Sequence, residues 1–380
     1  MEFEWSPEDA AFRRELAAFL DAELPADWDE LAKDGPGSEA QAAFSRGFCA
    51  ALAERGWLTP HWPPEVGGRG ASAWQHAILG EELWSRGEPR GPQYMNVNWI
   101  GPTILRYGTE AQRREHLPRI ARGDVLWCQG FSEPDAGSDL VALRTRALRD
   151  GDAYVVEGSK IWTSYANHAE LCFLLARSDA ASSRHRGLSV LLVPMALPGI
   201  EVREIPSVVG ERYFHEVVFR GVRVPAEARL GPEGEGWEVV SYALQYERVG
   251  APRYARAART LDRLVAALPV GALEDPSLLA RLGEARALCE AARLLSYRVV
   301  DQRARGQAPS ADTNVARVAG TFAEQWVADL ALELAGPAGF EVGSFADAQF
   351  RMGMTAGVAV GATEVQLNLI ASRWLGLPRE

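Results

Sequence analysis

The residues with the most chemical character form a polar loop, residues 132–139, which reads Ser-Glu-Pro-Asp-Ala-Gly-Ser-Asp. The loop follows an apolar run, Val125–Phe131, which the sequence predicts as a short strand. Gly137 allows a backbone to approach a ligand closely because it has no side chain. Ser132 and Ser138 offer hydroxyl and backbone N–H groups to the polar atoms of a ligand.

A second segment of interest reads Gly158-Ser159-Lys160-Ile161-Trp162-Thr163-Ser164 and lies on the expected return strand of a hairpin. Its indole stands beside two hydroxyl residues, and this combination suits a wall for a flat heteroaromatic ring. Either segment alone is more typical of a surface loop or a tryptophan at a sheet edge. Together they predict a ligand site.

A third candidate is an acid on a predicted helix after Gly236. Apolar residues recur there at spacings of three and four, and Glu247 follows the same spacing, so it falls on the apolar face of the helix. A carboxylate on such a face is costly unless it is paired or catalytic. Glu247 is therefore either one half of an ion pair with a neighbouring helix or a general base.

The composition excludes several classes of function. The formal net charge of −11 comes without a basic stripe, which argues against a nucleic-acid binder. No apolar run reaches the roughly 18 residues of a membrane span, and the acidic first residues are unlike a signal peptide. The four cysteines and six histidines show no metal-type spacing, so we expect no metal site and a reducing, cytoplasmic setting.

The periodicity of the apolar residues changes twice along the 380 residues, which are too many for one ordinary core. Residues 1–123 predict an all-helical domain, residues 124–230 a β domain, and residues 231–380 a helical bundle. The fold class is thus α+β and multidomain, with a barrel or sandwich at its centre. The predicted helices begin at Ser6, which acts as N-cap, and continue over 38–55, 73–85, 96–107 and 109–121. The predicted strands are Val125–Phe131, Tyr154–Glu157, Leu171–Ala176, Leu188–Val193, Ile200–Ile205 and Val217–Val224.

The two polar segments, taken with this order of domains, resemble the FAD-dependent acyl-CoA dehydrogenase family. The Ser-Glu-Pro-x-Ala-Gly-Ser-Asp loop combined with Gly-Ser-Lys-x-Trp is specific to that family, and the resemblance covers nearly the whole chain. It implies oxidation of an acyl-CoA thioester to the 2-enoyl thioester. A carboxylate removes the α-proton in that reaction, while a hydride leaves the β-carbon for flavin N5.

The resemblance also bears on the base. Many members carry it as the first Glu of Tyr-Glu-Gly-Thr-x-Glu near the C-terminus, where this chain has Ala359-Val360-Gly361-Ala362-Thr363-Glu364. Valine cannot accept a proton. A subset of the family places the base in a Glu-Arg pair on the helix after the β domain, and Glu247-Arg248 matches that pair. We therefore predict that Glu247 is the catalytic base and that Pro252, which lacks an N–H, kinks the helix beside it.

Further site residues follow from the resemblance alone. The CoA thioester arm is expected to meet Ser138, Gln245 and Arg248. Thr363 is interpreted as the N-cap of the last helix, completed by Gln366 as a capping box. The cap is either purely structural or, as the resemblance implies, close to the FAD diphosphate. The residues implied to contact non-covalent FAD are Gln129, Phe131, Ser132, Gly137, Ser138, Trp162, Thr163, Ser164, Thr363 and Glu364.

The chain departs from the family where neighbouring subunits complete the cofactor site. Homotetrameric members supply an Arg-x-x-Phe-Gly segment and a Gly-Gly-x-Gly loop to FAD. Here the first is absent and the second reads Gly336-Pro337-Ala338-Gly339. Two assemblies stay open. One is an α2β2 heterotetramer in which this chain bears the base, and the other is a homo-oligomer with a substitute cation among Arg253, Arg256, Arg259 and Arg263.

Two rival functions stay open at this level. One is an acyl-CoA oxidase of the same fold, and the other is a catalytically silent partner of a heteromeric dehydrogenase. The resemblance further implies an electron-transfer flavoprotein as electron acceptor and favours branched or bulky acyl groups. A carrier-protein thioester in place of CoA is a further alternative.

Overall fold

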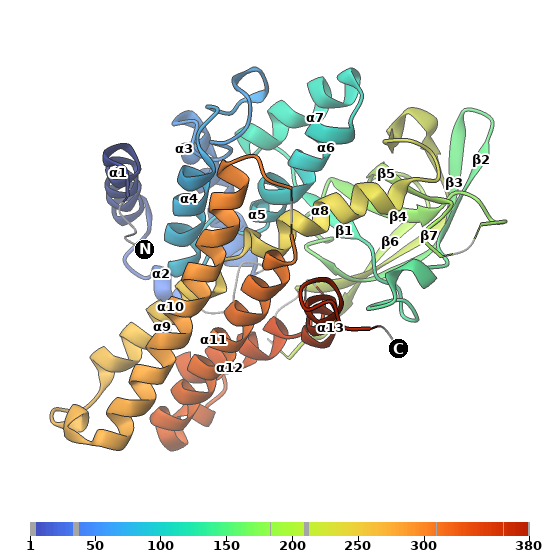
Figure 1. Ribbon diagram of the computed structural model, residues 1–380. Coiled ribbons are helices and arrows are strands. Elements are labelled where there is room, and N and C mark those ends of the chain that lie inside the picture. The colour runs from blue at the N-terminus through green and yellow to red at the C-terminus, as the bar shows by residue number, and fades with distance from the viewer. Residues whose placement is uncertain are drawn as a thin grey trace. The chain divides into compact units, whose positions relative to one another are not determined.

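The computed structural model describes residues 5–32, 38–182, 184–208, 213–308, 310–359 and 361–378, apart from the side chains of 248–250. The chain forms two compact units (Figure 1). One unit combines Met1–Gly35, Ala71–Pro89 and Arg248–Glu380, and the other combines Pro36–Gly70 with Arg90–Glu247. Because the units follow contacts rather than chain order, the boundaries predicted at 123/124 and 230/231 stay predictions.

The second unit begins with helices whose ends follow from their capping residues. Ser38 caps α3, and Thr109 and Gln112 form a capping box at the start of α7. Gly123 ends α7 in the left-handed conformation, with a φ of 75°. Before α8 (Gly236–Gly250), its helical elements are α3 Glu39–Glu54, η1 Pro64–Val66, α5 Gln93–Met95, the π-helical turn η2 Asn96–Ile100, α6 Gly101–Tyr107, α7 Glu110–Arg122, η3 Leu140–Ala142 and η4 Ala226–Ala228.

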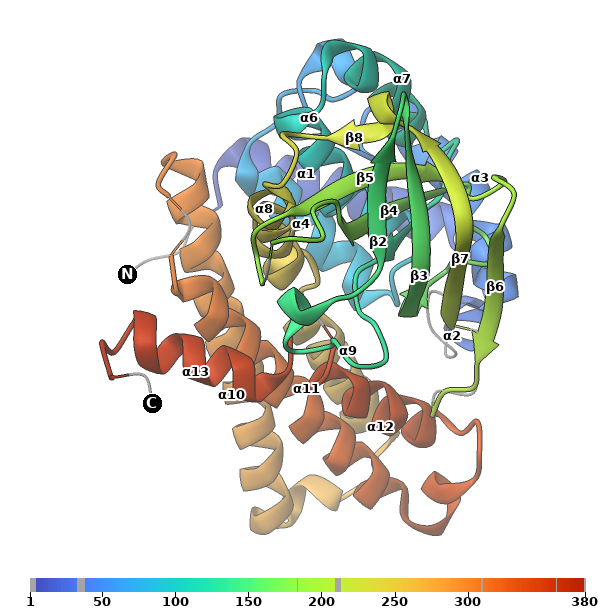
Figure 2. The same ribbon diagram turned by 90° about the vertical axis from the view of Figure 1, so that its right-hand side faces the viewer.

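A mixed sheet makes up the rest of this unit. Its strands are β1 Trp127–Gly130, β2 Arg146–Asp150, β3 Ala153–Ser164, β4 Leu171–Arg177, β5 Leu188–Pro194, β6 Ile200–Ile205, β7 Phe214–Pro225 and β8 Arg229–Leu230. The order is β6-β7-β3-β2-β4-β5-β8, with β1 pairing in parallel to β4. Figure 2 shows β6, β7, β3 and β2 side by side. The inward-facing side chains, among them Cys128, Ala147, Val156, Leu174 and Val217, form its buried core.

The six predicted strands are present, although β3 and β7 are longer than expected and two further strands were missed. Within β2 only Ala147 is buried, so its sequence shows little of the apolar alternation that marks a strand. β8 has two residues and pairs only with β5. Pairing with neighbours, rather than local pattern, makes these two segments strands.

The first unit is helical. It contains α1 Pro7–Glu23, α2 Trp28–Leu31, α4 Ala73–Ser85, α9 Arg253–Ala267, η5 Ala272–Glu274, α10 Pro276–Ala304, α11 Asp312–Ala335, η6 Gly336–Phe340, α12 Phe345–Ala356 and α13 Thr363–Arg373. Ser6 caps α1 as predicted, through a bond from the Asp9 N–H. Inside the unit, the buried Glu81 accepts hydrogen bonds from Tyr254 (2.7 Å) and Tyr297 (2.9 Å) and pairs with Arg13.

Helix α8, Gly236–Gly250, passes from one unit to the other, because the division falls between Glu247 and Arg248. It ends at Gly250, and α9 begins at Arg253 with Pro252 as its N-cap. Pro252 thus marks a break between two helices rather than the kink that the sequence predicted. Its missing N–H leaves no bond with which α8 could continue.

Candidate active site

The two polar segments singled out in the sequence lie against each other. The Ile161 N–H donates to the Ser132 carbonyl oxygen at 2.8 Å. The buried Lys160 ammonium donates to the Phe131 carbonyl oxygen at 2.9 Å and to the Glu133 carboxylate at 2.8 Å. The loop after β1 is therefore fixed directly onto β3.

Glu133 is held by backbone as well as by Lys160. Its carboxylate accepts the N–H groups of Arg144 (2.6 Å) and Thr145 (2.8 Å). Burial raises the pKa of Glu133, but the Lys160 ammonium and these hydrogen bonds outweigh burial, so the pKa lies below its usual range. Burial lowers the pKa of Lys160, and Glu133 opposes that change. The ion pair of Glu133 and Lys160 thus fixes the polar loop to β3, and we call this pair the lock. The exposed groups of the two segments belong to other residues.

Trp162 has a strained backbone. Its φ is +57°, a region that L-residues other than Asn and Asp rarely adopt, and it falls at an irregularity in the pairing of β3 with β7. The side chain is 54% exposed, and its ring meets Phe214 edge to face with centroids 5.9 Å apart. Strain at an exposed aromatic residue is typical of a functional position.

The two residues after Trp162 differ in exposure. Thr163 is fully buried and pairs with His215 of β7, while Ser164 is half-buried and pairs with Phe214. Successive strand residues face opposite sides of a sheet, so the Ser164 hydroxyl, not that of Thr163, faces the Trp162–Phe214 side. Any contact of Thr163 with a ligand on that side is left to its backbone.

Gln129 is positioned by a residue that the sequence analysis missed. The Trp99 indole N–H, on the π-helical turn η2, donates to the Gln129 side-chain oxygen at 2.8 Å. The amide nitrogen of Gln129 has no acceptor among the described residues. Trp99 therefore orients the amide so that its N–H groups stay available to a ligand. Nothing in the local sequence of Trp99 signals this role.

Phe131 and the remainder of the loop differ in burial. Phe131 is buried against Phe173, with ring centroids 5.9 Å apart. Gly137 and Ser138 are exposed, and a Cβ built on Gly137 would meet no atom within 4 Å. Ser132 is half-buried. The loop thus presents small residues to open space, as a close approach by a ligand requires.

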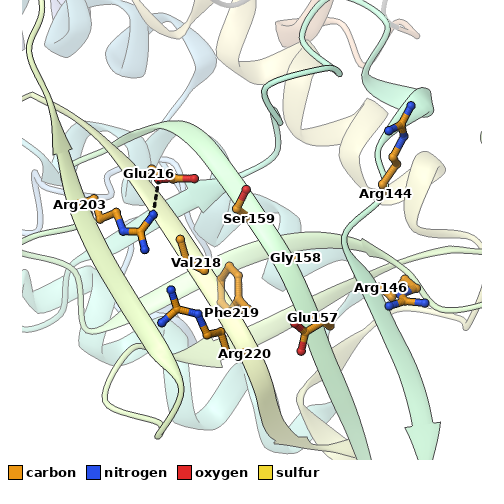
Figure 3. A pocket seen from close by; sticks show the side chains of 10 residues that line it. All are labelled: Arg144, Arg146, Glu157, Gly158, Ser159, Arg203, Glu216, Val218, Phe219 and Arg220. Atoms are coloured by element: carbon orange, nitrogen blue, oxygen red, sulfur yellow. Dashed lines mark hydrogen bonds and ion pairs between the residues drawn. The ribbon is translucent and has the colours of Figure 1, made fainter.

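A hollow of about 630 Å³ lies on the outer face of β2, β3, β6 and β7. Figure 3 shows Arg144 and Arg146 on one side of it, Arg203 and Arg220 on the other, and Ser159 between them. The sequence analysis did not select these arginines. The alternation Arg144-Thr145-Arg146, which begins five positions after the end of the polar loop, is the signal that would have found the first two.

The predicted base lies near the end of α8. Glu247 is half-buried, as is Gln245, and the fully buried residues of the helix include Val240 and Ala243. The side chain of Arg248 and residue Val360 lie outside the described residues. Glu247 as the base therefore stays a prediction.

The last helix corrects one prediction. Thr363 is the first residue of α13 and Ala362 is its N-cap, without a side-chain cap bond. The Thr363 hydroxyl donates instead to the Gly357 carbonyl oxygen at 3.2 Å, and the Gln366 side-chain oxygen accepts from Asn314 at 2.6 Å. The predicted capping box is therefore absent, because Gln366 is engaged with α11. Glu364, in the first turn, is exposed.

The four arginines considered as a substitute cation differ in how firmly they are paired within their own unit. Arg253 (2.9 Å) and Arg256 pair with the buried Glu324. Arg259 (3.8 Å) and Arg263 (3.2 Å) lie within ion-pair distance of Asp29. The loop Gly336–Phe340 forms the short helix η6.

Neither a metal-binding cluster nor a membrane helix occurs in the described part of the chain. No group of three or more His, Cys, Asp or Glu side chains there could hold a metal ion. No helix there is long and apolar enough to cross a membrane.

Comparison with protein families gives a consistent picture. The acyl-CoA dehydrogenase N-terminal domain matches residues 6–124, the middle domain matches 128–222, and the C-terminal domain matches 234–375. The acyl-CoA dehydrogenase IpdE1 of Mycobacterium tuberculosis is 36% identical over 379 residues, covering 97% of this chain and 98% of the relative. (2S)-Methylsuccinyl-CoA dehydrogenase of Cereibacter sphaeroides is 32% identical over 357 residues, covering 86% of this chain and 63% of the relative.

Solved structures agree over the full length. The Tcur3481-Tcur3483 steroid ACAD superposes with a TM-score of 0.92 at 33% identity, covering 100% of both chains. The ChsE4-ChsE5 complex from Mycobacterium tuberculosis superposes with a TM-score of 0.85 at 32% identity, also covering 100% of both chains. Each of these names joins two protein names, and the second is described as a complex.

Family members use FAD, and the residues of this chain fit that cofactor. An exposed aromatic wall at Trp162 suits the ring system, the donor amide of Gln129 has no protein acceptor among the described residues, and a hollow with surplus arginines suits the anionic diphosphate. The predicted order of helical, β and helical domains is confirmed. The chain belongs to the acyl-CoA dehydrogenase family and is an FAD-dependent oxidoreductase that acts on acyl-CoA.

Proposed function

We propose that this chain catalyses α,β-dehydrogenation of an acyl-CoA thioester to the 2-enoyl thioester, with Glu247 as the general base. The observation that carries the proposal is the flavin wall, by which we mean Trp162 and Ser164 on β3. Trp162 is held strained and exposed on the same sheet face as Ser164, and the polar loop is locked to its strand through Glu133 and Lys160. FAD, when bound, supplies the acceptor for the β-hydride at N5.

The residues of the chain divide the remaining work. Glu247 removes the α-proton, and a pocket closed to water would raise its pKa towards the working range. Gln129, oriented by Trp99, offers N–H donors to the flavin edge, and Ser164 offers a hydroxyl on the same side as Trp162. Ser138, Gln245 and Arg248 are assigned to the CoA arm. Val360 supports Glu247 as base, since valine at the alternative position cannot accept a proton.

The acyl group is proposed to be bulky. Members with the base on this helix favour branched or bulky groups, and one structural relative at 33% identity carries the name steroid ACAD. A polycyclic or branched acyl-CoA is therefore the substrate class to test before straight chains. An electron-transfer flavoprotein is the proposed acceptor of the electrons.

The test of the base is Glu247→Gln in the protein loaded with FAD. Loss of a general base reduces the rate by roughly 10²–10⁴-fold, so anaerobic bleaching of the flavin by substrate should slow by at least that much while bound FAD is retained. Glu238→Gln is the matched control, because Glu238 is exposed on the same helix and its carboxylate accepts from Tyr107 at 3.2 Å. Equal bleaching in Glu247→Gln and the parent chain would exclude Glu247 as base.

One rival keeps a specific observation in its favour. The missing Arg-x-x-Phe-Gly segment suits a catalytically silent subunit that supports an active paralogue. In such a subunit, substrate would reduce the flavin neither in the parent chain nor in the Glu247→Gln variant. An oxidase of the same fold would instead release peroxide during aerobic turnover. The same spectroscopic experiment, run with and without oxygen, separates both from a dehydrogenase.

The proposed assembly is an α2β2 heterotetramer in which this chain bears the base. Two structural relatives are named as pairs of different chains, Tcur3481-Tcur3483 and ChsE4-ChsE5. The pairing of Arg253 and Arg256 with the buried Glu324 weakens the case for either of them as a substitute cation in a homo-oligomer, which leaves Arg259 and Arg263 as candidates on α9.

A further inference from the structure

The hollow on the outer sheet face carries more positive than negative charge. Its lining includes the guanidinium groups of Arg144, Arg146, Arg203 and Arg220 against the carboxylates of Glu157 and Glu216. Between the positive groups lie Gly158 and Ser159 of β3, which leave room and add a hydroxyl (Figure 3). A concave surface with this excess of guanidinium groups suits a phosphate-bearing ligand.

The arginines on the two sides of the hollow differ in how far their charge is already neutralised. Arg203 pairs with Glu201 (2.8 Å) and Glu216 (3.2 Å), and Arg220 pairs with Glu201 (2.8 Å).

On the side of the hollow next to β2, the positive charges of Arg144 and Arg146 are not neutralised by a close carboxylate. The only carboxylate that approaches Arg144 within the described chain is Asp135, at 3.7 Å, and both side chains are about four-fifths exposed (82% and 78%). No described carboxylate lies within ion-pair distance of Arg146. Arg144 and Arg146 therefore supply the positive charge that is available to a ligand.

The hollow lies on the same sheet face as the flavin wall. Ser159 pairs with Val218 and Ser164 pairs with Phe214, and these two β7 residues lie four positions apart and so face the same side of the sheet. Trp162 lies between the two pairs, at the irregularity in the pairing of β3 with β7. Trp162 lies three positions after Ser159, which corresponds to about 10 Å along a regular strand. The Thr145 hydroxyl donates to the Ser159 carbonyl oxygen at 3.2 Å, which places Arg144 and Arg146 beside this stretch of β3.

We propose that Arg144 and Arg146 bind the diphosphate of FAD and thereby take over the role of the Arg-x-x-Phe-Gly clamp that this chain lacks. The inference rests on the proposed flavin wall at Trp162, from which the ribityl chain would extend along β3 to the hollow. The Glu133 carboxylate accepts hydrogen bonds from the backbone N–H groups of Arg144 and Thr145, and these bonds fix the backbone that carries the two arginines. The cations thus come from the unit that holds the ring, not from α9.

The same chemistry, an adenosine diphosphate group, is present in CoA. FAD is favoured because the hollow lies on the face that carries Trp162, and because Arg253 and Arg256 of α9 are engaged with the buried Glu324. The experiment therefore measures both ligands separately.

The test compares the double variant R144Q/R146Q with the parent full-length chain, each in the assembly in which it is purified. Dissociation constants for FAD, riboflavin and CoA are measured by flavin fluorescence and calorimetry. Removing each charge-assisted hydrogen bond should weaken FAD binding roughly tenfold. Riboflavin lacks the diphosphate, so its binding should not change, and the dependence of FAD binding on salt should become shallower.

The matched control is Arg149→Gln. Arg149 lies on the same strand, but its side chain donates to the Gly151 carbonyl oxygen at 2.8 Å and covers the Tyr154 ring, outside the hollow. Arg149→Gln should leave all three dissociation constants as they are, and circular dichroism checks that all variants fold.

The outcomes are distinguishable. Unchanged FAD binding in R144Q/R146Q would overturn the inference, and weakened CoA binding with unchanged FAD binding would reassign the hollow to CoA. Equal losses for FAD and riboflavin would show a general disturbance of the wall and also overturn it. A parent chain that binds neither flavin in any assembly would overturn the proposed function itself.

Discussion

At the scale of single residues, the site depends on a side chain whose backbone adopts an unfavourable conformation. Trp162 adopts a φ of +57°, and L-residues in that region are less stable by about 1–2 kcal/mol. The surrounding β3–β7 pairing and the Phe214 ring hold it there. The chain thus keeps an exposed indole at the expense of stability, which is the pattern expected of a residue retained for binding.

A pair of substitutions at Trp162 separates strain from binding. Both Trp162→Ala and Trp162→Gly remove the indole and should weaken FAD binding to a similar degree. Glycine tolerates a positive φ, so the Gly variant of the flavin-free protein should be more stable than the Ala variant by about 1 kcal/mol. Urea unfolding gives the stabilities and flavin fluorescence the affinities. An Ala variant as stable as the Gly variant would mean that the backbone is not strained in solution.

At the scale of elements, the decisive contact joins the loop after β1 to β3. Lys160 and Glu133 are both buried, and Glu133 also accepts two backbone N–H groups. Removing one member of such a pair leaves an uncompensated buried charge, which costs about 3–5 kcal/mol. The Glu133–Lys160 lock therefore controls both the stability of the second unit and the placement of the polar loop, residues 132–139.

The lock predicts a specific pH dependence. The pKa of Glu133 in the folded chain lies below its usual 4.5, so ionised Glu133 stabilises the fold above that value, and this stability is lost as the pH falls through the lowered pKa. Lys160→Met should lower the unfolding free energy by about 3 kcal/mol or more at neutral pH. The double variant with Glu133→Gln should recover part of that loss and show a weaker acid dependence. Chemical unfolding between pH 3 and 7 measures both. A Lys160→Met chain with parental stability would show that the pair is not formed.

At the scale of the whole molecule, the open question is where the chain obtains a complete cofactor site. The relatives named as two-chain assemblies support a heteromer, whereas Arg144 and Arg146 offer a diphosphate site within this chain. These two views are compatible, because a partner subunit can complete the adenine side of a site that already holds the ring and the diphosphate.

The flavin content of the purified chain, set against its mass, resolves the assembly. Purified alone, the chain should carry well below one FAD per chain, and co-purification with a paralogous subunit should raise the ratio towards one. Absorbance at the flavin band and light scattering measure the two quantities. About one FAD per chain in a tetramer of this chain alone would contradict the heterotetramer. A parallel R144Q/R146Q sample would show whether Arg144 and Arg146 bind the flavin that co-purifies with the chain.

Much of this protein was readable in the sequence because the signals are local. The Ser-Glu-Pro-x-Ala-Gly-Ser-Asp loop, the Trp162 segment and the two changes of periodicity depend only on residues near one another in the chain, and they led to the family and the order of domains. Helix starts such as Ser6 and Ser38 were also predictable, since a cap is formed within one turn.

What only the tertiary structure decided depends on partners far away in the chain. Gln366 looked like a capping residue, but Asn314 of α11 engages it, so the cap at Thr363 does not form. Arg146 on β2 was not selected from the sequence, because β6 and β7 complete the hollow around it only in the folded chain. The positive φ of Trp162 depends on the pairing of β3 with β7. In each case the competing partner or neighbour lies dozens of residues away, and folding alone brings it into contact.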